Sequence, residues 1–287
     1  MTFYLGVDAG GSNCRARLVD AGGAVIGSAQ AHGTANASIG ADALHARLLD
    51  ITGQALAQAG VTAGQRGEVR AGMGIAGLGR ADVRAELAAL PFGFASIAFA
   101  TDALIANLGA HGGRDGAILI VGTGSAVQLR VGGEDFTLGG YGFPISDEGS
   151  GAALGLSAMR HALRALDGRT RATELSLAVS ERWNHDAAQA IAWMDGATPR
   201  DYGAFAPLVM DHAEAGDPNA RAIVEEAASH LERFIDTIFA RGAPACALVG
   251  GLAPRMRPWL RARTVARLSE PEGDPLDGAL LLAGFRP

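Results

Sequence analysis

The hydrophobic pattern is strand-like at the start of the chain and again near its middle. An apolar stretch at 3–6 leads into a glycine-rich segment, after which apolar and polar side chains alternate over 14–19. A second apolar run at 117–120 leads into another glycine-rich segment and then into alternating residues at 127–131. Alternation of this kind is typical of a strand with one buried face. The sequence therefore predicts two similar hairpins, each made of a strand, a glycine loop and a returning strand.

Helical and strand-like patterns alternate along the rest of the chain. Apolar residues at helical spacing predict helices, and short apolar runs predict strands. The predicted helices are 42–59, 81–90, 104–109, a mostly helical region from 150 to about 241, and 277–284. The predicted strands outside the hairpins are 69–75, 97–100 and 245–249. This alternation favours an α/β fold, and the repeated hairpin indicates two lobes of similar topology.

The composition narrows the classes of partner. The 287 residues, 48% of them hydrophobic, are enough for two domains with sizeable cores. The net charge of −6 argues against nucleic acid and anionic membranes as partners, because both favour a basic surface. No apolar run is long enough to span a membrane, and no signal peptide is apparent, so we expect a cytoplasmic protein.

Phosphate binding in this chain must differ from that of a P-loop. All 24 Lys and Arg positions are arginine, and a P-loop requires a lysine. A dinucleotide-binding loop leads straight into a helix, whereas a strand follows each glycine loop here. The two cysteines, Cys14 and Cys246, form no CxxC pair, which argues against a structural zinc or iron–sulfur site. Any phosphate would be held by backbone N–H groups, hydroxyls, a metal ion or arginine.

The first glycine loop carries candidate phosphate and metal ligands. Asp8 ends the first strand, where a carboxylate can hold Mg²⁺ beside a triphosphate, although an Asx-turn would also place an aspartate there. Gly10 and Gly11 permit positive φ and close approach of the backbone to phosphate. Ser12 and Asn13 could donate hydrogen bonds to a phosphate, although capping or turn roles suit them nearly as well.

The second glycine loop offers donors of the same kind. The N–H groups of Gly122 and Gly124, together with the hydroxyls of Thr123 and Ser125, suit a γ-phosphate. Asp102 lies between the two hairpins, directly after a predicted strand. It is either a helix N-cap or a base that accepts a proton from an alcohol attacking a phosphoryl group.

Two further segments have more than one interpretation. Asp147 and Glu148 precede a long helix, where they could complement its dipole or bind substrate. Gly250 and Gly251 follow a buried strand and could let an adenine ring lie against the backbone, or could form a tight turn. Asn36 is a polar loop residue to which the local sequence assigns no role.

Taken in order, these segments resemble the sugar kinase/Hsp70/actin ATPase superfamily, and most closely its BadF/BadG/BcrA/BcrD branch, which includes N-acetylglucosamine and glucosamine kinases. Each motif is modest alone, but the ordered set is specific and spans residues 3–253. The matching segments are GVDAGGSNCRARLVD, AGMGIAGLG, TDA, GTGSAVQLR, GGYGFPISDEGSG and LVGGLAP.

The resemblance implies two RNase H-like domains that close over ATP·Mg²⁺ and a sugar. The first would comprise 1–112 joined by a C-terminal helix at about 275–287, and the second 113–274 with helical insertions. The resemblance also implies that the protein is a homodimer and that its binding partners are small molecules, an amino sugar and ATP. The expected reaction is phosphorylation of the 6-hydroxyl of N-acetylglucosamine or glucosamine by in-line transfer from ATP, without a covalent intermediate.

The resemblance also assigns roles to the candidate residues. Asp102 would take the proton of the 6-hydroxyl, and Asp8 would position Mg²⁺. The sugar would be bound by Asn36, Asp102, Ser125, Gly140, Tyr141, Gly142 and Asp147. ATP would be bound by Gly10, Gly11, Ser12, Asn13, Gly122, Thr123, Gly124, Gly250 and Gly251.

Departures from related families leave the sugar's 2-substituent open. Ala126 stands where the animal N-acetylglucosamine kinases have an asparagine, and Ala37-Ser38 replace their His-Trp. The cysteine-rich zinc motif of ROK sugar kinases is absent. Two other functions remain as alternatives: an ATPase that activates a partner enzyme through a cysteine-ligated cluster, and a non-catalytic nucleotide- or sugar-binding regulator.

Overall fold

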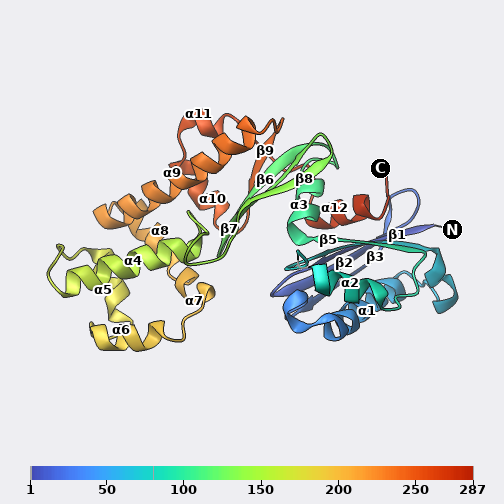
Figure 1. The fold of residues 1–287 in the computed structure, drawn as a ribbon, viewed down its shortest axis with the longest axis horizontal. Helices are drawn as coiled ribbons and strands as arrows, with labels where there is room; N and C mark the ends of the chain where they lie inside the picture. Colours follow the sequence, from blue (N-terminus) through green and yellow to red (C-terminus); the bar gives the residue numbers. More distant parts are fainter. Residues whose placement is uncertain (1, 80, 287) are drawn as a thin grey trace. The chain divides into compact units, whose positions relative to one another are not determined.

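The computed structural model describes residues 2–79 and 81–286, and the chain divides into two compact units (Figure 1). The first unit extends to Asp115 and includes the C-terminal segment from Glu270; the second is Gly116–Ser269. The expected domain boundaries at 112 and 275 both fall inside the first unit.

The first unit is built on a five-stranded mixed sheet of order β3-β2-β1-β4-β5. The first three strands are antiparallel neighbours, and β4 and β5 continue the sheet in parallel with β1. Their bounds are β1 Phe3–Ala9, β2 Asn13–Val19, β3 Val25–His32, β4 Val69–Ile75 and β5 Ser96–Thr101. The parallel arrangement brings the carboxyl ends of β1, β4 and β5 to one edge of the sheet.

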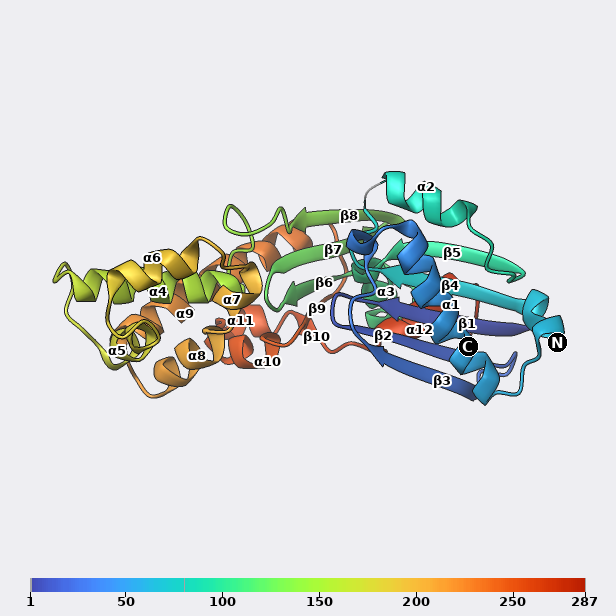
Figure 2. The same ribbon diagram turned by 90° about the horizontal axis from the view of Figure 1, so that it is seen from below.

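Helices cover both faces of this sheet. Helices α1 and α2 lie on one face, and α3 and α12 lie on the other (Figures 1 and 2). Their bounds are α1 Ala41–Gln58, α2 Ala81–Ala89, α3 Asp102–Ala110 and α12 Pro275–Leu282, with 3₁₀ turns at Ala37–Ile39 and Ala63–Glu68. The last helix therefore packs on the N-terminal sheet, as the family resemblance implied.

Glycines allow α12 to approach its neighbours at backbone distance. A Cβ built on Gly72 of β4 would lie 2.0 Å from the carbonyl oxygen of Ala279 in α12. One built on Gly278 of α12 would lie 1.8 Å from the carbonyl oxygen of Ile105 in α3. Because real Cβ atoms do not come this close, these positions require glycine for the observed packing.

The second unit repeats the strand connectivity of the first. Its sheet has the order β10-β9-β6-β7-β8, with β6, β7 and β8 antiparallel and β9 and β10 joining in parallel. The bounds are β6 Gly116–Val121, β7 Ser125–Val131, β8 Glu134–Gly139, β9 Cys246–Val249 and β10 Leu268–Ser269. The predicted repetition of topology is confirmed, whereas the two-residue β10 was not predicted because it is too short to produce a pattern.

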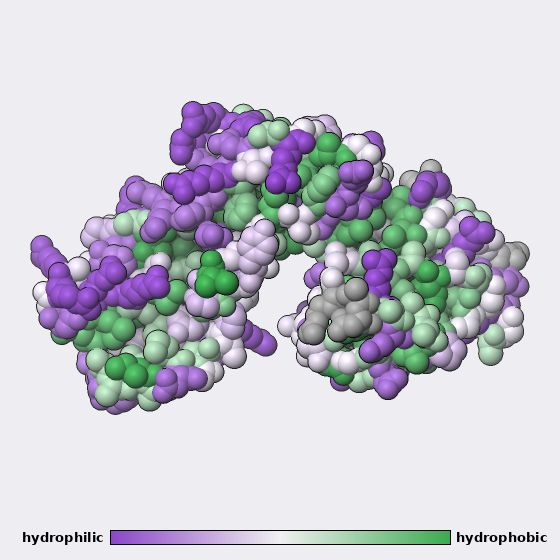
Figure 3. Space-filling model, viewed as in Figure 1, coloured by the Kyte–Doolittle hydropathy of each residue, from purple (hydrophilic) through white to green (hydrophobic). Residues whose placement is uncertain are grey.

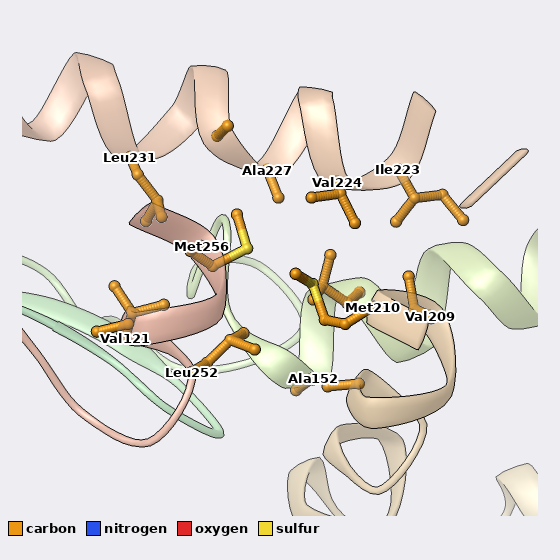
Figure 4. Packing of buried hydrophobic residues seen from close by; sticks show 14 of the residues in the cluster. Val121, Ala152, Val209, Met210, Ile223, Val224, Ala227, Leu231, Leu252 and Met256 are labelled. Atoms are coloured by element: carbon orange, nitrogen blue, oxygen red, sulfur yellow. The ribbon is translucent and has the colours of Figure 1, made fainter. Parts of the chain in front are cut away.

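A helical region between β8 and β9 supplies most of the second core. Figure 4 shows side chains of α9, among them Ile223, Val224 and Leu231, facing Met210 of α8 and Met256 of α10. The helices are α4 Gly151–Leu166, α5 Glu174–Glu181, α6 Ala187–Met194, α7 Pro199–Gly203, α8 Ala206–Glu214, α9 Pro218–Ala240, α10 Ala253–Met256 and α11 Ala262–Val265, with a 3₁₀ turn at Arg257–Trp259.

The exposed surface carries no large continuous apolar area on the face shown in Figure 3, where apolar residues form separate patches among hydrophilic ones. Among the described residues, no helix combines the length and apolar character that crossing a membrane would require.

Candidate functional site

The first group of candidate residues lies at the carboxyl edge of the first sheet. Asp8 is the penultimate residue of β1, and Asp102 follows the last residue of β5. Both strands are parallel to β4, which lies between them. In open α/β sheets ligands bind at this edge, because the loops that follow the strands converge there.

Asp8 is held by an arginine on the neighbouring strand. The β1–β2 register places Arg15 directly opposite Asp8, and Arg15 Nη2 lies 2.6 Å from Asp8 Oδ2. The two side chains line a polar pocket together with Gln30 and the loop 10–13. Arg15 was not predicted as a site residue, because its contact with Asp8 follows from the hairpin register.

The loop after β1 is a closed turn fastened to the segment after β3. The Gly10 N–H donates to the Asn13 carbonyl at 2.9 Å. This N–H is therefore not free to bind a phosphate, although Gly10 was expected to bind ATP. Neither Gly10 nor Gly11 has a positive φ, which corrects the reason proposed for them. The carbonyls of Gly10 and Ser12 accept from N–H groups of the segment 33–35, which fixes the loop in place.

The side chains of this loop differ in what they already contact. Asn13 Oδ1 lies 2.8 Å from His32 Nδ1, so its amide bridges β2 and β3. Ser12 is exposed at the tip of the loop. Asn13 is exposed as well, and its contact with His32 uses the amide oxygen and not the Nδ2 donor, so both predicted side-chain donors stay candidates for binding a phosphate.

Asp102 is not the helix cap that its position allowed. The cap of α3 is Thr101, whose hydroxyl oxygen accepts from the Leu104 N–H at 3.1 Å. Burial raises the pKa of the Asp102 carboxyl; the Ala103 N–H opposes this rise, and the negative charge of Asp8 adds to it. A half-buried carboxylate with a raised pKa, and without a capping role, has the properties of a general base.

Asn36 begins the 3₁₀ turn after β3. Its Oδ1 accepts from the Ser38 N–H at 3.0 Å and from the Ser38 hydroxyl at 2.6 Å. Its Nδ2 lies beside the first glycine loop, 3.7 Å from the position that a Cβ on Gly11 would occupy. The structure therefore places Asn36 next to the phosphate-loop candidates of the same unit.

The second glycine loop, 122–124, is joined to the start of α4. The Gly122 N–H donates to the Gly124 carbonyl at 2.9 Å, so it too is occupied, contrary to expectation. The carbonyls of Gly122 and Thr123 accept from the first two N–H groups of α4 at 2.8 and 3.0 Å. Helix α4 thus holds this loop at the carboxyl edge of the second sheet.

Asp147 lies against the same loop. A Cβ on Gly124 would be 2.9 Å from Asp147 Oδ2, so only glycine leaves room for this carboxylate. Burial raises the pKa of Asp147, while the N–H groups of Ser125 and Phe143 stabilise its charged form. The backbone of Asp147 has φ 68°, an uncommon conformation for a residue with a side chain. Such strain is typical of functional sites, so the half-buried Asp147 remains a candidate.

The alternative role of Asp147 and Glu148 at a helix terminus is not realised. The cap of α4 is Ser150, and the first turn of the helix contains no acidic residue. The Ser125 hydroxyl, expected to bind substrate, instead donates to the Glu148 carbonyl at 2.7 Å, and the side chain is only 3% exposed. Ser125 therefore fixes the segment that carries Asp147.

The loop after β8 is shaped by glycines. Gly140 and Gly142 have φ of 68° and 98°, in the region that glycine adopts most readily. A Cβ on Gly140 would lie 2.9 Å from the Cβ of Ala126. Tyr141 lies between the two glycines and is 79% exposed. The loop thus presents backbone groups and one aromatic side chain to solvent.

A separate pocket in the second unit joins the glycine loop to the segment after β9. Gly250 has φ 104°, and a Cβ there would lie 2.4 Å from the Val121 carbonyl oxygen, so this turn requires glycine. The pocket is lined by Gly122, Thr123, Gly151, Gly203, Ala206, Pro207, Gly251, Leu252 and Arg255. Gly203, Ala206, Pro207 and Arg255 were missed, because nothing in their local pattern distinguishes them from other helical residues.

The donor set of the first unit fits Mg²⁺. No cluster of three His, Cys, Asp or Glu side chains in the described part of the chain could hold a metal ion by itself. Mg²⁺ is typically bound by one or two carboxylates together with phosphate oxygens and water. Asp8, in a polar pocket beside a phosphate-loop candidate, supplies such a carboxylate.

One amino sugar kinase is similar to the chain over nearly its whole length, and another over less than half of it. Glucosamine kinase GspK of Vibrio cholerae serotype O1 is 37% identical over 284 residues, which cover 99% of this chain and 96% of that protein. An N-acetylmuramic acid/N-acetylglucosamine kinase of Clostridium acetobutylicum is 33% identical over 134 residues, 45% of this chain and 44% of that protein.

Solved structures have the same two-unit architecture. A protein of Chromobacterium violaceum, provisionally described as an N-acetylglucosamine kinase, matches with a TM-score of 0.88 at 34% identity and covers 99% of each chain. ROK hexokinase of Thermus thermophilus matches with a TM-score of 0.59 at 19% identity, a likeness of fold alone, and covers 98% of each chain. The predicted fold class of two RNase H-like α/β domains is confirmed.

The sequence profile of the BadF/BadG/BcrA/BcrD ATPase family matches residues 5–283. This range contains both glycine loops, the three site aspartates and the turn at Gly250. The chain therefore belongs to the BadF/BadG/BcrA/BcrD ATPase family.

Proposed function

We propose that this protein is an ATP-dependent kinase that phosphorylates the 6-hydroxyl of an amino sugar. The observation that carries the proposal is Asp102, a half-buried carboxylate of raised pKa at the carboxyl edge of the first sheet, where it caps no helix. The full-length similarity to glucosamine kinase GspK supports the substrate class.

In this proposal the chain contributes mainly positioning and charge. Asp102 accepts the proton of the attacking hydroxyl, and its raised pKa brings it closer to the operating pH than an ordinary aspartate. Asp8 holds Mg²⁺, which when bound neutralises charge on the transferring phosphoryl group. Ser12 and Thr123 donate to phosphate oxygens, and Arg15 keeps the Asp8 carboxylate oriented.

We assign the sugar hydroxyls to Asn36, Asp102, Asp147 and the backbone of Gly140, Tyr141 and Gly142. Ser125 is assigned a positioning role, because its hydroxyl hydrogen is already donated to Glu148. The adenosine is assigned to the pocket that includes Gly251.

We further propose glucosamine, with its free amine, as the preferred substrate. The side chain of Ala126, beside Gly140, has no polar atom that could bind an acetamido group, in contrast to the asparagine of the animal enzymes. Glucosamine kinase GspK, which is 37% identical over 99% of this chain, also supports this choice.

The chemistry of the cysteines disfavours the partner-activating ATPase. Cys14 and Cys246 are free, buried thiols, and burial raises their pKa values to about 11 and about 12. A cluster shared between subunits would need exposed thiolates, and these groups are neither exposed nor readily ionised.

The test is release of ADP by purified protein with Mg·ATP and, in parallel, glucosamine, N-acetylglucosamine, N-acetylmuramic acid, glucose or no sugar. We expect strong stimulation by glucosamine and weaker stimulation by the others. A slow rate independent of sugar would favour an ATPase that activates a partner. ATP binding without hydrolysis under every condition would favour a regulator.

The need for Mg²⁺, a homodimeric state and a cytoplasmic location also belong to this proposal, and they rest on the family resemblance and on the fit of Asp8 to a hard cation. Titration with EDTA should abolish turnover, and MgCl₂ should restore it. Sedimentation equilibrium should give twice the mass of the chain; a monomer mass at all concentrations would contradict the dimer.

A further inference from the structure

The pocket beside the second glycine loop is lined mostly by apolar residues and glycines and has few polar side chains. Of its nine lining residues, only Thr123 and Arg255 have polar side chains; the others are glycine, alanine, proline and leucine. Thr123 belongs to the loop assigned to phosphate. If the pocket holds a nucleotide by that end, as the proposed function requires, then Arg255 lies on the side left for ribose and base.

Arg255 is held on every edge of its guanidinium group. Nε and Nη2 donate to Glu214 Oε1 at 3.1 and 2.7 Å, and Nη2 also lies 2.8 Å from Asp211 Oδ1. Nη1 donates to the Pro207 carbonyl at 3.4 Å. These contacts fix the plane of the group and leave few N–H directions for hydrogen bonds to a ligand, while the side chain stays 32% exposed and lines the pocket.

The helix that carries Arg255 is itself anchored. Leu252, which precedes α10, and Met256, the last residue of α10, belong to the core under α9, as Figure 4 shows. The Leu252 N–H donates to the Val121 carbonyl at 3.0 Å, which ties this helix to the strand that leads into the glycine loop. The backbone that carries Arg255 is therefore fixed relative to the glycine loop.

We infer that the guanidinium plane of Arg255 stacks on the nucleotide base and is the main protein group that recognises it. A flat cation over an aromatic face is a favourable contact. Because the lining offers no side-chain amide, carboxylate or second hydroxyl to read the edge of the base, purine donors other than ATP are accepted. Base identity is then read by stacking and shape, and Asp211 and Glu214 act by orienting the arginine.

The experiment measures nucleotide binding without sugar, by calorimetry, for the full-length protein and its variants. Arg255→Met should weaken ATP and GTP alike by about five- to tenfold, and should leave competition by inorganic tripolyphosphate unchanged. Arg255→Lys keeps the charge but lacks the plane and should behave like Arg255→Met. Glu214→Gln should give a smaller loss. The control is Arg169→Met, which removes an exposed arginine that is paired with Asp167 and does not line the pocket; this variant should bind like the unaltered protein.

Recovery of ATP affinity by Arg255→Lys, or weakened tripolyphosphate competition in Arg255→Met, would show that Arg255 acts on phosphate charge and would overturn the inference. A preference for ATP over GTP of more than about a hundredfold would also overturn it. The outcomes separate this inference from the proposed function. If the protein phosphorylates no amino sugar but shows the Arg255 pattern, the proposed function is wrong and the inference stands. If it is an active kinase without that pattern, the inference is wrong and the proposed function stands.

Discussion

At the scale of single residues, a neighbouring hydroxyl takes the structural role beside each of two candidate aspartates. Thr101 caps α3, so the carboxylate of the adjacent Asp102 does not serve as the helix cap. Ser125 likewise fixes the backbone at Glu148, next to the strained Asp147. Both aspartates could be predicted from ordered motifs. Their neighbours' roles could not, because a cap or a hydroxyl contact depends on dihedral angles that the sequence does not reveal.

Replacing Asp102 by asparagine should separate binding from chemistry. Asp102→Asn removes the proton acceptor while keeping the shape of the side chain, so we expect kcat to fall by about 10²-fold or more with little change in ATP affinity. Steady-state kinetics and calorimetry measure the two effects. The matched control is Asp42→Asn, an exposed acid in the first turn of α1. Full turnover in Asp102→Asn would remove the residue from the proposed mechanism.

At the scale of helices and strands, some elements could be predicted from their own sequence pattern, whereas others depend on contacts with distant parts of the chain. The hairpins, α1 and β4 were predictable, because alternation and helical spacing record which face each element buries. Strand β10 and the ends of β5 and α3 were not, since these depend on partner strands and caps. The close packing of α12 was also hidden, because a glycine at an interface looks the same in sequence as one in a turn.

The packing of α12 predicts opposite effects for two glycine-to-alanine changes. Gly72→Ala would place a Cβ against the backbone of α12 and should lower the free energy of unfolding by about 1–3 kcal/mol. Gly53→Ala, inside α1, meets nothing within 4 Å and should raise it by about 0.5–1 kcal/mol. Urea unfolding compares the two. Shifts of the same sign would contradict the packing account.

Asp217 predicts a pH-dependent contribution to the second unit. It caps α9, accepting from Asn219 and Ala220 N–H groups, and its other oxygen accepts from the Leu175 N–H of α5 at 2.9 Å. Burial alone would raise the pKa of Asp217, but these donors outweigh it and lower the pKa. Asp217→Asn leaves a single acceptor oxygen and should cost about 1–2 kcal/mol at pH 7.

The sign of the pH effect follows from the lowered pKa. The ionised carboxylate stabilises the fold at pH values above its ordinary pKa, and this stabilisation is lost as the pH falls through the lowered, folded-state value. The difference in free energy of unfolding between Asp217→Asn and the unaltered protein should therefore shrink in acid. A difference that is constant from pH 7 to pH 3 would show that the charge of Asp217 is unimportant.

At the scale of the whole molecule, one topology is used twice with different additions. Each unit has a five-stranded sheet of the same connectivity and a glycine loop after its first strand. The ordered motifs made this repetition predictable. The pocket lining beyond the glycine loops was not, because Ala206, Pro207 and Arg255 reach it from helices that are distant in sequence from the second glycine loop and lack any distinctive pattern.

The most direct measurement is the identity of the product formed from Mg·ATP and glucosamine, by ¹H–³¹P correlation spectroscopy of the unfractionated reaction. We expect a new phosphorus signal coupled to the two protons on carbon 6 of the sugar, and we expect this signal to be absent with the Asp102→Asn variant. A phosphorus signal coupled to another sugar proton, or inorganic phosphate as the sole product, would contradict this expectation.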